Sequence, residues 1–170
     1  LTPGNYGVDF LREQGLDAAG APVVKCSNFI GDALDEAAAL GFADVLLVGH
    51  IGKLVKLAGG VMNTHSRYAD SRYADCRTEL LCAHAAVCGA SQKTCAALLD
   101  AATTDACIAL LDEAGLRAPV LDSLLRAVER HLVRRAAGAY RVGAVLFSNG
   151  LLGRTASAAE MLAEWKGKKQ

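Results

Sequence analysis

The sequence predicts an α/β fold in which a small, mainly parallel sheet is flanked by helices, in a Rossmann-like plan with a helix-rich second half. Two continuous apolar runs, residues 45–48 and 142–147, are typical of strands buried on both faces of a parallel sheet. Segments with helical spacing alternate with such runs in the first third of the chain, as in βα units. Aromatic residues make up 5% of a chain that is 52% hydrophobic, which favours close-packed helices over a β-sandwich.

The composition limits the classes of partner. Eighteen basic and eighteen acidic residues leave no net charge, which disfavours binding to nucleic acid. The longest stretch without Asp, Glu, Lys or Arg is residues 80–92, thirteen residues, which is shorter than the ~20 that a membrane helix needs. We therefore expect neither a nucleic-acid partner nor a membrane partner.

The six cysteines include no Cys-x-x-Cys pair, and four of them lie in Ala/Leu-rich helical sequence. This pattern favours buried free thiols in a reducing compartment over disulfides or a metal site, so we expect a cytoplasmic protein without a bound metal. A chain of 170 residues is long enough for one domain with its own core. Because it starts Leu-Thr-Pro-Gly without an initiator Met, we expect it to be part of a longer protein.

Residues 1–60 are predicted to consist of βα units. The elements expected there are a helix over 8–15, a strand over 21–26, a helix over 30–40, a strand over 45–48 and a helix over 53–58. Ser27 and Asn28 are suitable N-caps for the second helix. Because a turn leads directly into the first helix, a further strand is expected just upstream of Leu1.

The rest of the chain is predicted to form a polar loop over 61–79, a helical region over 80–138, and a final strand and helix over 139–170. The helices expected are 75–88, 91–101, 104–114 and 119–137, followed by a strand over 140–147 and a helix capped by Thr155 or Ser157. The arginines of the helix over 119–137 are interpreted as a solvated face. Ser66–Asp70 is followed at once by an identical copy, Ser71–Asp75. Five extra residues would rotate a helix by about 140°, so we expect the copy in a loop or at a helix start.

Small polar residues follow each predicted strand. In open parallel sheets, ligands bind outside the carboxyl ends of the strands, so these loops are expected to surround one ligand crevice. The residues proposed to hold a cofactor there are Gly4, Asn5, Ser27, Asn28, Gly49, Gly52, Ser148 and Asn149.

The turn from Gly49 to Lys53 leads from a strand into a helix, and unpaired amides at a helix start suit an anionic ligand. A nucleoside-triphosphate loop is excluded by spacing, because Leu47 and Leu54 stand where that motif needs glycine and Ser or Thr. An ordinary βα turn with a solvated lysine is the alternative. His50 is interpreted as a general base, a hydrogen-bond donor or a cap of the turn.

Four consecutive polar residues, Asn63 to Ser66, follow two glycines, which indicates a folded loop with a function. The segments 2–7, 25–31, 46–60 and 63–66, with an Ala-Asp-x-Arg-x-Glu run after them, resemble the cobalt-precorrin-5B C(1)-methyltransferase family (CbiD type) of anaerobic cobalamin biosynthesis. The resemblance covers nearly all of this chain but only the C-terminal half of the family proteins, so the missing partner is the N-terminal half.

The resemblance implies transfer of a methyl group from S-adenosylmethionine to ring carbon C-1 of a cobalt-containing tetrapyrrole. It implies catalytic roles for His50 and His65, with substrate-binding residues Lys53, Lys56, Asn63, Thr64, Ser66, Asp75 and Arg77. Lysines and arginines are suitable partners for the carboxylates of such a macrocycle. The tandem copy offers two Ala-Asp pairs, and Asp75, Arg77 and Glu79 are matched because only this set includes the glutamate.

Two other functions are alternatives to the methyltransferase. One is a non-catalytic α/β module that binds a corrinoid or an anion within a larger enzyme. The other, nucleotide hydrolysis, is disfavoured by the failed loop spacing. The leucine-rich helix over 119–137 could pack internally or form the interface of a homo-oligomer.

Overall fold

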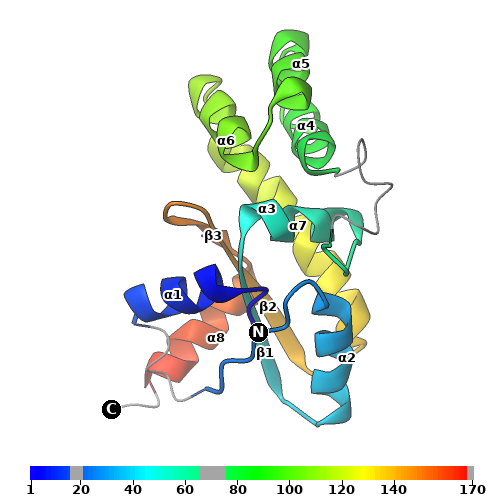
Figure 1. The fold of residues 1–170 in the computed structure, drawn as a ribbon, viewed down its shortest axis with the longest axis vertical. Helices are drawn as coiled ribbons and strands as arrows, with labels where there is room; N and C mark the ends of the chain where they lie inside the picture. Colours follow the sequence, from blue (N-terminus) through cyan, green and yellow to red (C-terminus); the bar gives the residue numbers. More distant parts are fainter. Residues whose placement is uncertain (16–20, 66–75, 168–170) are drawn as a thin grey trace.

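The computed structural model describes residues 1–15, 21–65 and 76–167, which form an α/β fold with helices on both faces of a small sheet (Figure 1). The elements are α1 (Asn5–Glu13), α2 (Ile30–Ala39), β1 (Asp44–His50), α3 (Ile51–Leu54), the 3-10 helix η2 (Val55–Gly59), α4 (Arg77–Val87), α5 (Gln92–Asp100), α6 (Thr104–Glu113), α7 (Arg117–Ala136), β2 (Arg141–Phe147), β3 (Leu151–Arg154) and α8 (Ala156–Gly167). The helix-rich second half is confirmed.

The sheet has the strand order β1-β2-β3 and is mixed. β1 and β2 run parallel, in register from Asp44 opposite Arg141 to His50 opposite Phe147, whereas β3 pairs antiparallel with β2. The expected mainly parallel sheet is therefore not what the described strands form. The cause is the turn at residues 148–150, which was expected only as a ligand loop. Its Asn-Gly pair is a hairpin signal that folds β3 back onto β2.

The strand predicted over 21–26 is reduced to a single parallel bridge between Thr2 and Lys25. Leu1 and Thr2 lie between this segment and β1, so the outer segment has one short partner to pair with. The strand expected upstream of Leu1 stays a prediction.

The apolar run of β1 is buried on both faces, as predicted. Val45 and Leu47 belong to a large core that the sheet forms with α2, η2 and α4 to α7, whereas Leu46 and Val48 belong to a smaller core beneath α1 and α8. Figure 1 shows α1 and α8 on one side of the sheet and α2 and α7 on the other. Alternate residues of one strand thus supply two separate cores.

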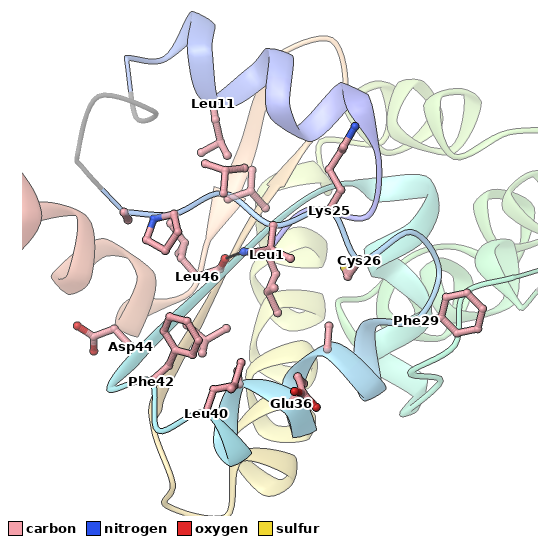
Figure 2. Close-up of a pocket in the computed structure, with 18 of the residues that line it drawn as sticks. Leu1, Leu11, Lys25, Cys26, Phe29, Glu36, Leu40, Phe42, Asp44 and Leu46 are labelled. Carbon is pink, nitrogen blue, oxygen red and sulfur yellow. Dashed lines mark hydrogen bonds between the residues drawn. The ribbon is translucent and has the colours of Figure 1, made fainter.

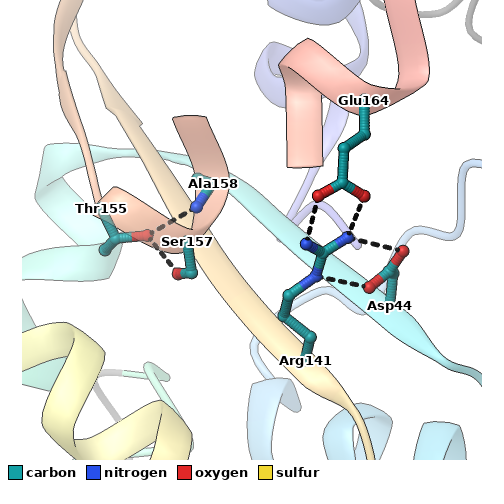
Figure 3. A network of polar contacts seen from close by, with 6 residues as sticks. All are labelled: Asp44, Arg141, Thr155, Ser157, Ala158 and Glu164. Atoms are coloured by element: carbon teal, nitrogen blue, oxygen red, sulfur yellow. Dashed lines mark hydrogen bonds and ion pairs between the residues drawn. The ribbon is translucent and has the colours of Figure 1, made fainter. Parts of the chain in front are cut away.

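Polar contacts fix α8 to the sheet (Figure 3). Arg141 donates to Asp44 over 2.8 and 3.2 Å and to Glu164 of α8 over 2.7 and 2.8 Å, so its planar fork joins β1, β2 and α8. Thr155 is the N-cap, since its Oγ1 accepts from the Ala158 amide over 3.3 Å. The same oxygen also accepts from the Ala144 amide of β2 over 3.0 Å.

Helices α4, α5 and α6 form a separate helical layer that packs on the end of α7 (Figure 1). Arg135 corrects the interpretation of the α7 arginines as a solvated face. Its guanidinium binds both carboxylate oxygens of Asp35 over 2.9 and 2.6 Å and donates to the Gly31 carbonyl over 3.2 Å, which fastens α7 to α2.

Cys26, Cys82, Cys88, Cys95 and Cys107 are free thiols. Cys26 and Cys107 are buried, and the other four cysteines are half-buried. Within the described residues, no helix has both the length and the apolar character that crossing a bilayer requires.

Candidate functional site

A cleft of about 870 Å³ lies outside the carboxyl ends of β1 and β2, and its size falls in the usual range for ligand sites. It is lined by α1, by the segments after β1 and β2, by Asn28, by the loop residues Thr64 and His65, by Arg77 at the start of α4, and by the first residues of α6. The floor includes the parallel stack of Phe10 on Phe147, whose ring centroids are 4.4 Å apart. Segments distant in the sequence thus meet where a ligand is expected.

The turn after β1 is held by His50. Its Nδ1 accepts a hydrogen bond from the Gly52 amide over 3.0 Å, so His50 is the N-cap of α3, one of the interpretations left open by the sequence. This bond assigns the proton of the neutral ring to Nε2, which makes that nitrogen a donor. A Cβ on Gly49 would lie 2.8 Å from Leu54 Cγ, so the close packing of α3 on the end of β1 needs glycine there.

Lys53 is held in the cleft by Asn28. The Lys53 ammonium donates to Asn28 Oδ1 over 2.6 Å, and the hydroxyl of Thr64 donates to the same oxygen over 3.1 Å. Thr64 is only 5% exposed, so this polar group is both buried and satisfied. Burial lowers the pKa of Lys53, and the nearby Lys56 adds to this effect.

The predicted N-caps of α2 are wrong. Phe29 is the N-cap residue, without a side-chain hydrogen bond, and Asn28 uses its side chain to hold Lys53. Ser27 has a left-handed backbone, with φ 52°, and lies outside the cleft lining. Asn28 belongs to the site because its amide oxygen accepts hydrogen bonds from residues distant in the sequence. Local capping patterns do not reveal such contacts.

Lys56 is 6% exposed, and its ammonium donates to the Thr64 carbonyl over 3.3 Å. It thereby fastens the loop before the undescribed segment to η2. The loop is stiffened further by Asn63, whose Oδ1 accepts from the His65 amide over 3.1 Å. These contacts place the exposed His65 on the cleft wall.

Sequence reasoning missed the acidic side chains of the cleft. Asp9 and Glu13 of α1 and Asp105 at the start of α6 line the same cleft as Lys53 and Arg77. Asp105 also accepts a hydrogen bond from Ser148, which ties α6 to the β2–β3 turn. The Thr103-Thr104-Asp105 run was correctly interpreted as a cap, with Thr103 Oγ1 accepting from the Ala106 amide over 3.1 Å, but capping gives no signal for a ligand wall.

Most of the predicted site residues come together. Those that line the cleft are Asn28, His50, Gly52, Lys53, Lys56, Thr64, His65, Arg77, Ser148 and Asn149, whereas Gly4, Asn5, Ser27, Gly49 and Asn63 do not line it. Asn5 faces elsewhere, since its Oδ1 accepts from Lys25. Ser66 and Asp75, with the tandem copy, lie outside the described residues, and Glu79 follows Arg77 in the first turn of α4.

No group of three or more His, Cys, Asp or Glu side chains within residues 1–15, 21–65 and 76–167 is arranged to hold a metal ion. The cleft instead combines cationic and anionic side chains, whereas the Gly52 amide at the start of α3 is already bound by His50 Nδ1. This set suits an organic ligand that carries charges of both signs.

Comparisons with known proteins agree on one family. Residues 63–156 match the family described as CbiD, C-terminal domain. The chain is 44% identical over 150 residues to the cobalt-precorrin-5B C(1)-methyltransferase of Ruminiclostridium cellulolyticum, covering 88% of this chain and 37% of that protein. It is 45% identical over 159 residues to the protein of that name from Photorhabdus laumondii, covering 90% and 40%.

A third protein of that name, from Alkaliphilus metalliredigens, is 36% identical over 164 residues, which are 95% of this chain and 42% of that protein. The chain thus spans about two fifths of the length of these relatives. No solved structure matches it.

Proposed function

Since this chain belongs to the CbiD family, we propose that it forms part of an enzyme that transfers a methyl group from S-adenosylmethionine to C-1 of cobalt-precorrin-5B. The observation that carries the proposal is the cleft, because it gathers Asn28, Lys53 and His65, from three separate segments that resemble the family, at the carboxyl ends of the strands. We also propose a Rossmann-like, mainly parallel sheet for the longer protein. The parallel β1–β2 pair and the parallel Thr2–Lys25 bridge support it.

The basic part of the cleft is proposed to bind the carboxylates of the tetrapyrrole. Lys53 is the best placed, because Asn28 orients its ammonium into a partly buried position at the strand ends. Arg77 lines the same cleft and offers the planar fork that suits a carboxylate. Lys56 is assigned a positioning role instead, because its ammonium is buried against the Thr64 carbonyl.

The acidic part of the cleft is proposed to face the methyl donor. A sulfonium and an amino group both carry positive charge, and Asp9, Glu13 and Asp105 supply the opposite charge. The donor supplies an activated methyl group, so the chain's task is to orient the two reactants and to exclude water. His50 is proposed to donate a hydrogen bond through Nε2, since Nδ1 is committed to the Gly52 amide.

The test is methyl transfer by the longer protein carrying Lys53→Met, with Lys25→Met as the matched control. Lys25 also donates to an asparagine side chain, over 3.3 Å, but lies outside this cleft. Lys53→Met removes one charged contact to the substrate, which is worth about 1.5–3 kcal/mol. We therefore expect KM for the tetrapyrrole to rise roughly 10- to 100-fold. The control is expected to stay within twofold of the wild type. Equal KM values in both variants would remove Lys53 from the substrate site.

The second candidate is a non-catalytic module that binds the corrinoid while the remainder of the enzyme carries the chemistry. This candidate is supported by the partial coverage, since the chain spans only 37–42% of the length of its relatives. Titration with S-adenosylhomocysteine separates the two. Heat of binding with both the 170-residue chain and the longer protein supports the donor site in this cleft, whereas binding by the longer protein alone supports the second candidate.

A further inference from the structure

A second cavity, of about 460 Å³, lies along the edge of β1 that does not pair with β2 (Figure 2). One wall is the backbone of residues 44–46 and the other is the segment 21–24. Leu1 closes the groove at one end, where Figure 2 shows it between Leu46 and Cys26. We call this cavity the edge groove.

The edge groove has the width of one β-strand. At its closed end, the Leu1 nitrogen donates to the Leu46 carbonyl over 2.7 Å, and the Val48 amide donates to the Leu1 carbonyl over 2.9 Å. On the other side, the Thr2 amide donates to the Val24 carbonyl over 2.9 Å, and the Cys26 amide donates to the Thr2 carbonyl over 3.0 Å. Leu1 and Thr2 therefore already fill the space between β1 and residues 24–26 as a parallel strand does.

The open part of the edge groove offers the next hydrogen-bonding groups of the same ladder. In a parallel ladder, a residue just before Leu1 would donate to the Pro22 carbonyl and accept from the Val24 amide. Among the described residues, neither of these two groups has a hydrogen-bond partner. The outer ladder ends there, because Pro22 has no N–H to donate.

Both faces of the edge groove are mainly apolar, although Asp32 and Glu36 of α2 also line it. On the α2 side lie Ala37, Leu40 and Phe42, and on the α8 side lie Leu162 and Trp165. Leu40 is 65% exposed and Phe42 is 41% exposed, although both line the groove. Large apolar side chains gathered in one exposed groove indicate a surface that another segment covers. A strand with apolar residues on both faces would pack against the α2 side and the α8 side at the same time.

We propose that the edge groove holds a β-strand formed by the residues that directly precede Leu1 in the longer protein. The relatives extend well beyond the matched region, since the alignments cover 37–42% of them, and the family match is to a C-terminal domain. A segment that is continuous with Leu1 enters the groove in the correct direction without any connecting loop. This inference is independent of the proposed function.

The Leu1 nitrogen already occupies a position of this ladder, since it donates to the Leu46 carbonyl over 2.7 Å. The preceding strand is expected to add about three residues, alternating between the α8 side and the α2 side, each apolar.

Amide hydrogen exchange, followed by NMR on the longer protein, tests this proposal. In the occupied groove the amides of Val24 and Cys26 face the inserted strand, whereas those of Val23 and Lys25 face outward. We expect Val24 to exchange at least about 100-fold more slowly than Val23. In the 170-residue chain, Cys26 alone of these four is expected to be slow.

Three results would overturn the proposal. The first is equal, fast exchange of Val24 and Val23 in the longer protein. The second is slow Val24 exchange in the 170-residue chain that becomes slower still as protein concentration rises, which assigns the groove to a second copy. The third uses a longer protein whose six residues before Leu1 are replaced by Gly-Ser repeats; unchanged Val24 protection there assigns the groove to a different segment.

Discussion

Replacing Asn28 by alanine is expected to loosen the candidate site and destabilise the fold together. One oxygen, Asn28 Oδ1, accepts from both the Lys53 ammonium over 2.6 Å and the Thr64 hydroxyl over 3.1 Å. The substitution leaves the Thr64 hydroxyl, 5% exposed, without its acceptor, which costs about 1–3 kcal/mol. Lys53 is half-buried, so its lost hydrogen bond adds less than about 1 kcal/mol after solvent screening.

The expected total is about 1–4 kcal/mol in the free energy of unfolding, measured by urea denaturation. With a urea dependence of ~2 kcal/mol per M, the midpoint falls by about 0.5–2 M. Asn5→Ala is the matched control, because Asn5 also accepts from a lysine, Lys25 over 3.3 Å, but at an exposed position. That variant is expected to lose at most about 0.5 kcal/mol.

A loss below about 1 kcal/mol for Asn28→Ala, or equal losses in the two variants, would refute this reasoning. Either result would mean that water replaces the amide oxygen without cost. The buried network would then not be what orients Lys53.

Three further predictions follow from polar groups outside this network or from its titration. Thr155→Val removes the oxygen that accepts from the Ala158 amide at the start of α8 and from the buried Ala144 amide. The free energy of unfolding measured in urea should therefore fall by about 2–4 kcal/mol. Thr155→Ser keeps the oxygen and should lose less than about 1 kcal/mol. Burial lowers the pKa of Lys53 in the folded protein below the 10.5 of the unfolded chain. Between these two pKa values the unfolded chain binds more protons, so the free energy of unfolding should rise as the pH rises towards 10.5. In the Lys53→Met variant this rise should be smaller. Burial, with the nearby Arg130 and Arg126, lowers the pKa of His84 in the folded protein. The thermal stability should therefore fall as the pH drops from 6.5 to that lowered pKa. If a His84→Gln variant shows the same fall in thermal unfolding, His84 is not its cause.

The strongly periodic elements could be predicted from the sequence. The strands at 45–48 and 142–147 lie within β1 and β2, and the four central helices were placed within about two residues of their ends. The rule for strand ends also predicted correctly that Asn28, Lys53 and Ser148 meet at one cleft. These predictions succeeded because each depends on local pattern or on a general topological rule.

The remaining features depend on tertiary contacts that leave no local signal. Asn28 is a residue type that is typical of helix N-caps, yet its side chain binds Lys53, which is 25 residues away in the sequence. Asp9 and Glu13 are indistinguishable by pattern from the solvated face of any helix, and only packing of α1 beside the strand ends makes them a cleft wall. β3 was missed because four residues are too few to show alternation.

Helix α7 connects the sheet to the helices beside the cleft. Its 20 residues extend about 30 Å, and it packs against β2 and α2 as well as against α4 and α6. The position of Asp105 in the cleft therefore depends on the packing of α6 against one end of α7, whose other contacts lie in the sheet core. The Ser148–Asp105 hydrogen bond joins α6 directly to the β2–β3 turn, so the two sides of the cleft are linked both through α7 and across the cleft.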